Sequence, residues 1–454
     1  MAATSALDII ALLPQRNCGE CGEPLCVTFA AQLRGGKRQV ADCPHLGEED
    51  IAKLIEALVP PVQGVVIGNG GRPLVVGEER VLYRHELRFF HPPALAILVD
   101  DDLSPEDQRA KIEKIKALDF SRMGEQLCVD MVAVRSRTGS ADLLVEAVRR
   151  VRDGCDLPVA LVTSDPVIAR ESLTALGGGP ALLCFATKDN LEEMAAVARD
   201  FAAPLAVQAP MAELESLVER VQKLGVSSLL LAPVSSASAS FSAGPNELTS
   251  LRRMAINEGR LGYPILVYPV GPLPEAQEIT WAAALVAKYA GVVFLESAEP
   301  HAIYPLLVLR QSVYADPTVP ATVQPGLYTE GSPDRNSPIL LTGNFAMTYS
   351  MVSSDVRSAG VNAYVVVADG QGYSVGVACL LGAIASEQVS QLLDETGVRD
   401  KVDHHCLIIP GLMEPLKDKL QTATGMEILV GPIDSRHIAR YLEDSWHPVS
   451  QAPQ

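Results

Sequence analysis

The stretch Ala94-Leu-Ala-Ile-Leu-Val99 is the first of eight short apolar runs that decide the fold of the middle of this 454-residue chain. Each run is followed by a polar or Gly/Pro-containing turn and then by a segment of helical periodicity. Unbroken apolar strands are typical of a parallel sheet whose two faces are both buried. The other seven runs are Met131–Arg135, Val159–Thr163, Ala181–Ala186, Leu205–Gln208, Leu229–Ala232, Ile265–Tyr268 and Val292–Leu295.

Eight strand–helix units predict a TIM (β/α)8 barrel over residues 93–325, with an open doubly wound sheet as the alternative. The helices between the strands include Pro105–Leu118, Asp142–Val151 and Leu191–Phe201. In such a barrel the loops after the strands carry function. Here those loops hold no convincing catalytic pair, because Asp165 and Asp189 are typical helix caps. We therefore assign no catalytic residue.

A second α/β unit is expected over residues 326–447, after a Pro-rich, linker-like segment at 316–338 and before a tail at 448–454. Its alternating strands and helices predict a small Rossmann-like sheet. The predicted strands are Ile339–Thr342, Ala363–Ala368, Cys406–Ile409 and Glu427–Val430. The predicted helices are Thr348–Ser358, Val375–Glu395, Glu414–Thr422 and Ser435–Glu443.

Glycines follow the strands of this second unit, and they predict a ligand site at one edge of its sheet. A glycine lets the backbone approach a ligand, and a helix N-terminus beyond it binds polar or anionic groups. No G-x-G-x-x-G motif is present, which argues against a nicotinamide cofactor. The alternative is that the glycines serve only as helix caps and turns.

Four cysteines near the start of the chain have the spacing C-x2-C-x4-C-x16-C: Cys18, Cys21, Cys26 and Cys43. Three cysteines in a Gly-rich loop, with a fourth before a proline, are typical of a [4Fe-4S] site. Zinc and a disulfide framework are the alternatives. Helices expected at Ser5–Leu13, Val27–Arg34 and Glu48–Leu58 complete a cluster module at residues 1–60.

Residues 61–92 are predicted to form hairpins that link this module to the barrel. The apolar segments are Gly64–Gly68, Pro73–Val76 and Glu79–Phe90, with a turn at Asn69-Gly70-Gly71.

Composition narrows the class of protein. The formal net charge of −18 argues against nucleic-acid binding, which needs a basic surface. No apolar run approaches the ~20 residues that span a membrane, and no secretory signal is visible. Five cysteines scattered outside the module indicate a reducing compartment, so we expect a cytoplasmic protein.

Several stretches together resemble one family, the large (gamma) subunit of the corrinoid iron–sulfur protein of the acetyl-CoA synthase/decarbonylase (CO dehydrogenase) pathway. The resemblance covers nearly the whole chain. It lies in Cys18–Cys43, Glu79–Glu86, Val129–Val134, Leu309–Pro317, Asn344–Tyr349, Tyr373–Val375 and Leu407–Gly411.

The resemblance implies a methyl-carrier subunit of a methyltransferase and acetyl-CoA synthase system with two cofactors, a [4Fe-4S] cluster and a cobalamin (corrinoid). A methyltransferase would pass methyl from methyl-tetrahydrofolate or a pterin analogue to Co(I), and acetyl-CoA synthase/CO dehydrogenase would accept it. The cluster would reduce Co(II) back to Co(I), and a small subunit would complete a heterodimer. The corrinoid-binding residues it implies are Thr342, Gly343, Asn344, Thr348, Tyr349, Gly372, Tyr373, Ser374, Val375, Gly376, Val377, Gly411 and Gly431.

This sequence also departs from the pattern of corrinoid proteins. It lacks the D-x-H-x-x-G motif, and His404 and His405 are expected in a solvated turn, so we predict no histidine on cobalt. Val377 stands where the family usually has a threonine facing cobalt, and Cys379 replaces an aromatic residue. Drift in a pocket made mostly of backbone explains this, with Cys379 as an apolar filler. The alternative is a paralogue with a different methyl donor and acceptor.

Overall fold

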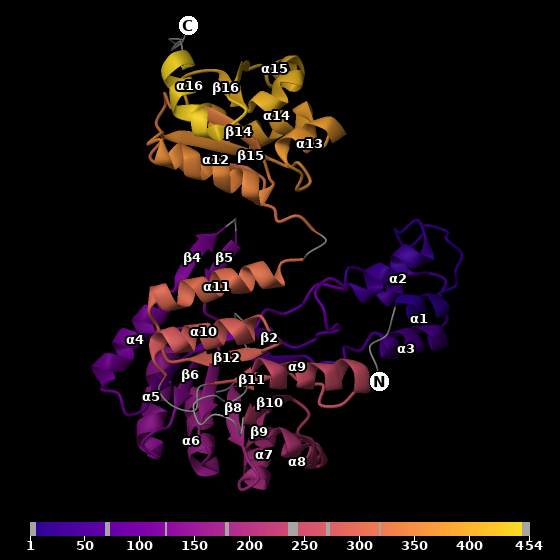
Figure 1. Ribbon diagram of the computed structural model, residues 1–454, viewed down its shortest axis with the longest axis vertical. Coiled ribbons are helices and arrows are strands. Elements are labelled where there is room, and N and C mark those ends of the chain that lie inside the picture. The colour runs from indigo at the N-terminus through magenta and orange to yellow at the C-terminus, as the bar shows by residue number, and fades with distance from the viewer. Residues whose placement is uncertain are drawn as a thin grey trace. The chain divides into compact units, whose positions relative to one another are not determined.

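The structure is a computed structural model that describes residues 6–68, 73–122, 125–177, 181–234, 244–268, 273–316 and 319–446. The chain divides into two compact units (Figure 1). The first comprises Met1–Asp119 and Leu127–Ala315, and the second comprises Phe120–Gln126 and Asp316–Gln454. The predicted turn at 69–71 and the predicted tail at 448–454 lie outside the described residues.

Eight parallel strands of the first unit form a nearly closed barrel. Their order is β10-β9-β8-β7-β6-β3-β12-β11, and a parallel bridge between Leu231 and Ile265 joins the two end strands. This confirms the predicted barrel and excludes the open sheet. The strands are β3 (Ala94–Asp100), β6 (Met131–Arg135), β7 (Val159–Val162), β8 (Leu182–Ala186), β9 (Leu205–Pro210), β10 (Leu229–Val234), β11 (Leu266–Val267) and β12 (Val292–Leu295).

Helices surround this barrel, and polar side chains fix where several of them begin. Ser104 accepts a hydrogen bond from the backbone N–H of Asp107, and Asp165 accepts from Val167 and Ile168. Asp165 is therefore a helix cap, as predicted. The helices are α4 (Pro105–Ala117), α5 (Ala141–Gly154), α6 (Pro166–Leu176), α7 (Leu191–Asp200), α8 (Met211–Lys223), α9 (Pro245–Arg253), α10 (Glu275–Val286) and α11 (Pro300–Tyr314).

A short hairpin closes the N-terminal end of the barrel. Strands β1 (Val65–Ile67) and β2 (Leu74–Val76) pair antiparallel, as the sequence predicted. Their side chains pack in the same core as Ala94 and Met131, the first residues of two barrel strands. The hairpin is therefore part of the barrel core rather than a free connection.

Residues 79–91 are not the further hairpin that the sequence predicted. They form no strand and instead run along the barrel as an irregular segment, which we call the strap. Arg84 donates hydrogen bonds to the carbonyls of Ser312 and Val313, and Phe89 packs edge-on against Tyr289. The apolar residues of the strap thus pack on the barrel, which removes the need for a partner strand.

The cysteine module consists of α1 (Ala6–Ala11), α2 (Cys26–Arg34), a 3-10 turn at Val40–Asp42 and α3 (Glu48–Ala57). Ile9, Phe29, Leu33 and Leu54 form its small core. These residues recur at helical spacing, so one face of each helix turns inward.

A five-stranded sheet forms the second unit, in the order β13-β15-β14-β16-β17. Only β13 runs antiparallel. The strands are β13 (Gly326–Glu330), β14 (Ile339–Gly343), β15 (Ala363–Ala368), β16 (Cys406–Ile409) and β17 (Glu427–Val430). Strand β13 lies in the segment predicted to be a linker, which is a correction. It is a short edge strand preceded by a proline, so its sequence signal is weak.

Helices cover both faces of this sheet. α12 (Ala346–Ser358) and α16 (Ile438–Ser445) pack on one face, and α13 (Val375–Leu381), α14 (Ser386–Glu395) and α15 (Lys417–Thr424) pack on the other. The single helix predicted at 375–395 is broken, because Gly382 ends α13 with a φ of +66°. A further two-stranded sheet pairs β4 (Asp119–Arg122) with β5 (Glu125–Cys128).

Candidate cofactor sites

The four predicted ligand cysteines lie in one module around one loop. Cys18 is exposed, whereas Cys21, Cys26 and Cys43 are half-buried against the module core. All nine cysteines of the chain are free thiols, so the disulfide framework considered from the sequence is wrong.

Backbone geometry and the exposed side-chain amide of Asn17 hold the cysteine loop in place. Gly19 and Gly22 adopt φ angles of +80° and +81°, which other residues rarely adopt. The Asn17 side-chain oxygen accepts a hydrogen bond from the backbone N–H of Cys26 at 2.8 Å. The Asn17 N–H points at the Cys26 sulfur from 3.5 Å. Sequence analysis missed Asn17, because it is not the N-cap of α2, which is Leu25, and reaches the Cys26 N–H only through the fold of the loop.

The spacing of the thiols separates two kinds of metal centre. Four thiolates on one zinc ion lie about 3.8 Å apart, given Zn–S bonds of about 2.3 Å. Among the described residues, the only three potential ligands within 4.8 Å of one another are Cys18, Glu20 and His45. No three of the four cysteine sulfurs come that close. The four thiols are therefore too far apart to share one zinc ion, and they suit a larger, thiolate-bound group.

The second unit contains a cavity of about 400 Å³ at the C-terminal ends of its parallel strands. Strand β14 lies between β15 and β16. The chain passes from β14 to β15 on one side and then crosses over to β16 on the other side, so the strand order reverses at β14. Open α/β sheets bind ligands at this switch point. The residues that line this cavity include Thr342, Thr348, Met351, Val375, Ile408, Leu412 and Ile433.

Thr342 gives this cavity an unsatisfied polar group. Its side chain is fully buried, and its hydroxyl has no hydrogen-bond partner among the described residues. A buried hydroxyl without a partner costs free energy, and a native protein keeps one where it serves a purpose. A ligand with a polar atom and a large apolar body fits such a cavity.

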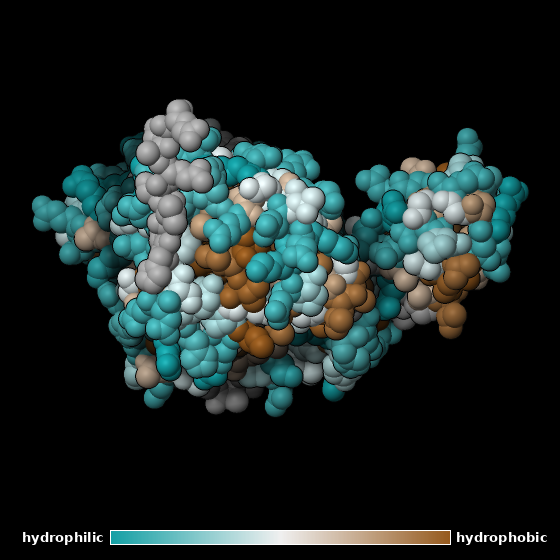
Figure 2. All heavy atoms as spheres, turned by 90° about the horizontal axis from the view of Figure 1, so that it is seen from above, coloured by the Kyte–Doolittle hydropathy of each residue, from teal (hydrophilic) through white to brown (hydrophobic). Residues whose placement is uncertain are grey.

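The second unit exposes several large apolar side chains, of which Met351, Leu412 and Ile433 line the cavity. Leu380 is 88% exposed, Ile433 72% and Leu381 63%, which is unusual for such large residues. Met347, Met351, Val377 and Leu412 are exposed as well. Figure 2 shows brown, apolar side chains gathered on the face of the second unit that is turned to the viewer. Apolar patches of this kind mark binding surfaces.

The predicted corrinoid residues fall into distinct places. Thr342, Thr348, Val375 and Gly431 line the cavity. Tyr373 and Val377 are exposed, and Ser374 and Gly376 lie with them at the start of α13. Tyr349 instead packs against Tyr328, with ring centroids 4.9 Å apart. Burial raises the pKa of Tyr349 to about 12.

Asn344 holds the neighbouring loop rather than facing the cavity. Its side-chain oxygen accepts hydrogen bonds from the N–H groups of Gly370 and Gly372, and its amide donates to Asp369. These bonds tie the loop after β15 to the end of β14, so Asn344 positions Tyr373. Gly372 needs its φ of +73° within this loop.

Three further glycines make room for close packing. An added Cβ at Gly411 would meet Ile433 at 2.8 Å, and one at Gly431 would meet Ile408 at 3.0 Å. Gly343 is looser, with its nearest neighbours at 3.6 Å. Sequence analysis missed the apolar lining residues Ile408, Leu412 and Ile433, which carry no signal that distinguishes them from core residues.

His404 corrects a prediction. It is buried, not in a solvated turn, and only His405 is exposed. The His404 ring contacts the Ser337 carbonyl at 3.0 Å and accepts from the Cys406 N–H at 3.2 Å. Burial lowers its pKa. Both ring nitrogens are thus used at the start of β16, the opposite end of that strand from the cavity.

Ion pairs join the ends of β3, β6 and β12 at the C-terminal mouth of the barrel. Arg135 donates two hydrogen bonds to Asp100, at 2.6 and 2.8 Å, and pairs with Glu296 at 2.8 Å. Burial opposes ionisation of both partners, yet their bonds lower the pKa of Asp100 and raise that of Arg135. Asp101 accepts hydrogen bonds from the backbone N–H groups of Arg137 and Thr138. Asp100, Arg135 and Glu296 thus satisfy one another.

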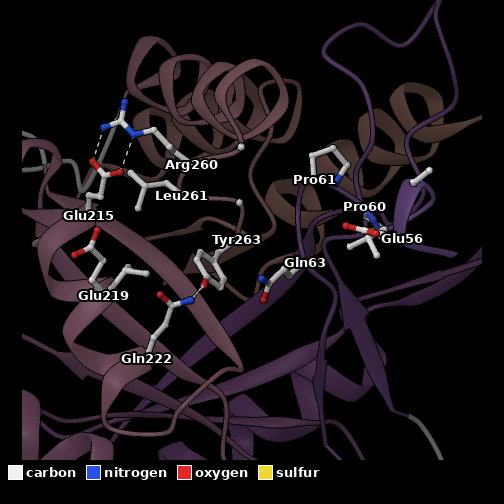
Figure 3. Close-up of a pocket in the computed structure, with 15 residues that line it drawn as sticks. Glu56, Pro60, Pro61, Gln63, Glu215, Glu219, Gln222, Arg260, Leu261 and Tyr263 are labelled. Carbon is white, nitrogen blue, oxygen red and sulfur yellow. Dashed lines mark hydrogen bonds and ion pairs between the residues drawn. The ribbon is translucent and has the colours of Figure 1, made fainter. Parts of the chain in front are cut away.

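A second cleft of the first unit, of about 370 Å³, is lined by the end of α3, by α8 and by residues 259–263 (Figure 3). Several of its charged and polar groups are also paired. Arg260 bonds Glu215, and Gln222 donates to the Tyr263 hydroxyl at 2.5 Å. Glu219 and Glu56 are exposed. Among the described clefts, the cavity beside Thr342 therefore offers the clearest unsatisfied site.

No described helix has the length and apolar character needed to cross a membrane.

Comparisons with known proteins give the following likenesses. Residues 64–442 match the family described as "CO dehydrogenase/acetyl-CoA synthase delta subunit", and residues 13–45 match one described as "Putative Fe-S cluster". The acetyl-CoA decarbonylase/synthase complex subunit gamma of Methanopyrus kandleri is 38% identical, with 98% of each chain covered. The corrinoid/iron-sulfur protein large subunit of Moorella thermoacetica is 34% identical, over 96% of this chain and 98% of its own.

Among solved structures, a dihydropteroate synthase from Xanthomonas albilineans aligns with a TM-score of 0.39 and 16% identity. It covers 56% of this chain and 100% of its own.

Proposed function

Because the chain belongs to the family of acetyl-CoA decarbonylase/synthase gamma subunits and corrinoid/iron-sulfur protein large subunits, we propose that it is a corrinoid methyl carrier with its own iron–sulfur cluster. A bound corrinoid supplies a cobalt that accepts methyl as Co(I) and passes it on, and a [4Fe-4S] cluster supplies the electron that returns Co(II) to Co(I). The chain's own residues hold and shield these groups.

The cluster is assigned to the thiolates of Cys18, Cys21, Cys26 and Cys43. Soft thiolate ligands suit iron–sulfur clusters, and the four thiols are too far apart to share one zinc ion. Asn17 keeps the Cys26 backbone in place, and the half-buried thiols limit access of water to one side of the site.

The corrinoid is assigned to the cavity at the ends of β14 and β16. The observation that carries this assignment is the buried, unpartnered Thr342 hydroxyl in the wall of a mostly apolar cavity. The hydroxyl provides one directed hydrogen bond, and Ile408, Leu412 and Ile433 provide apolar contact. The exposed Tyr373 and Val377 would meet the outer part of the ligand, together with Ser374 and Gly376 at the start of α13.

The proposed division of the chain follows from this assignment. Residues 1–60 hold the cluster, 61–92 connect it, 93–325 form the barrel, and 326–447 form a Rossmann-like corrinoid domain. Asp100, Arg135 and Glu296 at the barrel mouth pair with one another, so we assign the barrel a scaffolding role. The proposed partners are a small corrinoid iron–sulfur subunit, a methyltransferase and acetyl-CoA synthase/CO dehydrogenase. The five cysteines outside the cysteine module form no disulfide, which supports a cytoplasmic location.

The visible spectrum of anaerobically purified protein tests the proposal. We expect cob(II)alamin bands together with a broad iron–sulfur shoulder, each near one cofactor per chain. A cluster spectrum without corrinoid, even after reconstitution with cobalamin, contradicts the methyl-carrier function. A bound corrinoid that takes methyl from neither methyl-tetrahydrofolate nor a pterin analogue through a methyltransferase indicates a paralogue with other partners.

A further inference from the structure

The cysteine module contains a second possible set of metal ligands that overlaps the cluster site in one residue. Ligand atoms of Cys18, Glu20 and His45 lie within 4.8 Å of one another. We propose that, in protein without its cluster, these three side chains bind one thiophilic divalent cation such as Fe²⁺ or Zn²⁺. The inference rests on the proposed function only in taking Cys18 as a cluster ligand.

The distances suit a mononuclear ion. A tetrahedral ion with bonds of about 2.0–2.1 Å to nitrogen and oxygen separates those two atoms by about 3.3 Å. The Glu20 Oε2 and His45 Nε2 atoms are 3.2 Å apart. Thiolate, carboxylate and imidazole together are a donor set that Zn²⁺ and Fe²⁺ both accept. Binding requires that the Cys18 thiol release its proton to solvent.

Arg16 controls the histidine of this set. Its Nη1 lies 3.1 Å from His45 Nδ1, and because a guanidinium only donates, Nδ1 is the acceptor. The ring proton then sits on Nε2, toward Glu20. A metal at Nε2 needs that proton on Nδ1 instead, so the exposed Arg16 must turn away. Arg16 therefore opposes metal binding both by its hydrogen bond and by its charge.

The set is separable from the other three cysteines. Cys21, Cys26 and Cys43 pack against the module core, and none of them joins Cys18 in the group within 4.8 Å. Glu20 is exposed and lies in the same loop, one residue before Cys21. The first Fe²⁺ of cluster assembly can thus bind before the remaining thiols are engaged. Zn²⁺ in the same place would occupy Cys18 and block the cluster.

Titration of the cluster-free, full-length protein with Co²⁺ tests the site. Bound Co²⁺ should give a thiolate charge-transfer band in the near ultraviolet at one ion per chain. Glu20→Ala and His45→Ala should each weaken binding about tenfold or more, since even outer-shell changes at metal sites cost 10–100-fold. Arg16→Ala should tighten it. Glu48→Ala, an exposed carboxylate elsewhere in the module, is the matched control and should leave binding unchanged.

Cys21→Ser separates this site from a four-thiolate site. The proposal expects Co²⁺ affinity to survive this change. Loss of binding in Cys21→Ser, with wild-type binding in Glu20→Ala and His45→Ala, overturns it, and so does the absence of any band in the wild-type protein.

Cluster assembly under limiting Fe²⁺ gives a second readout. His45→Ala should assemble more slowly but reach the wild-type final absorbance, because all four cysteines remain. Equal rates of cluster assembly in the wild-type and His45→Ala proteins would contradict the role in assembly but not the metal site itself. Failure of the wild-type protein to assemble any cluster would instead contradict the proposed function.

Discussion

The barrel and the C-terminal sheet present the same kind of edge, the carboxyl ends of parallel strands, with opposite chemistry. At the barrel mouth, Asp100, Arg135 and Glu296 bond one another. At the C-terminal sheet, Thr342 keeps an unpartnered hydroxyl among apolar side chains. General rules place ligands at both edges. The difference teaches that satisfaction of polar groups, not the fold, decides which edge is available.

The largest expected effect is on the reduction of the corrinoid proposed to bind at the edge of the C-terminal sheet. Cys26→Ala removes one of the four proposed cluster ligands, so we expect complete loss of Co(II) reduction with corrinoid content unchanged. Anaerobic spectroscopy with a chemical or protein reductant measures both. Cys379→Ala, which removes a thiol packed beside the C-terminal core, is the control and should keep both. Survival of reduction in Cys26→Ala would place the electron route elsewhere.

The next largest effect is expected from breaking the ion pair between Arg135 and Asp100 at the barrel mouth. Arg135→Met leaves Asp100 partly unpaired in a site that is mostly buried, so we expect a loss of about 3 kcal/mol in the free energy of unfolding of the first unit. Denaturant unfolding measures it. Corrinoid content of the folded protein should stay the same. The exposed Arg149→Met should change stability by less than about 0.5 kcal/mol. A loss of corrinoid from folded Arg135→Met protein would show that the barrel mouth takes part in binding.

A smaller effect is expected at the edge of the C-terminal sheet, where one change should raise stability and weaken corrinoid binding. Thr342→Val removes the unpartnered hydroxyl, so the corrinoid-free protein should become more stable, by up to about 1 kcal/mol. Corrinoid should bind about tenfold more weakly, because one hydrogen bond to the ligand is lost. Thermal unfolding and cobalamin titration measure the two. Thr329→Val on the exposed face of β13 should leave cobalamin affinity unchanged. Equal affinity in Thr342→Val would remove the observation on which the corrinoid site depends.

The smallest effect is the pH dependence of the barrel edge. Burial opposes ionisation of Asp100, but its bonds to Arg135 and Arg137 lower its pKa below the ordinary value of about 3.9. A depressed carboxyl pKa stabilises the fold above the unfolded pKa and ceases to do so as pH falls through the folded pKa. The melting temperature of the first unit should therefore fall below about pH 4. Asp100→Asn should be less stable at pH 7 and show a shallower decline. An unchanged slope would mean that the mouth is not held by this charge.

Much of the fold followed from the sequence because buried parallel strands leave unbroken apolar runs. Met131–Arg135 and Ala363–Ala368 were predicted with the bounds that the structure shows. Edge strand β13 was missed because one strand partner and a preceding proline leave little pattern. The helix predicted at 375–395 was too long, since helical periodicity alone does not show that Gly382 turns the chain.

The two sites differed in how far they could be predicted. Four cysteines carry chemistry in their spacing, whereas Ile408, Leu412 and Ile433 look like any core residues. The burial of His404 was also hidden, because its partner Ser337 is distant in sequence and is reached only through the tertiary fold. Apolar lining and buried polar contacts depend on long-range packing that no local pattern records.

The β1–β2 hairpin makes the chain divisible at one place and not at another. A shortened chain that starts near residue 61 keeps Val65, Ile67 and Val76 in the barrel core. One that starts near residue 93 loses them and opens that core to water at its N-terminal end. A cut that removes the cysteine module must therefore fall before the hairpin if the barrel core is to stay closed. The hairpin that closes the barrel belongs to the segment that connects the cysteine module to the barrel.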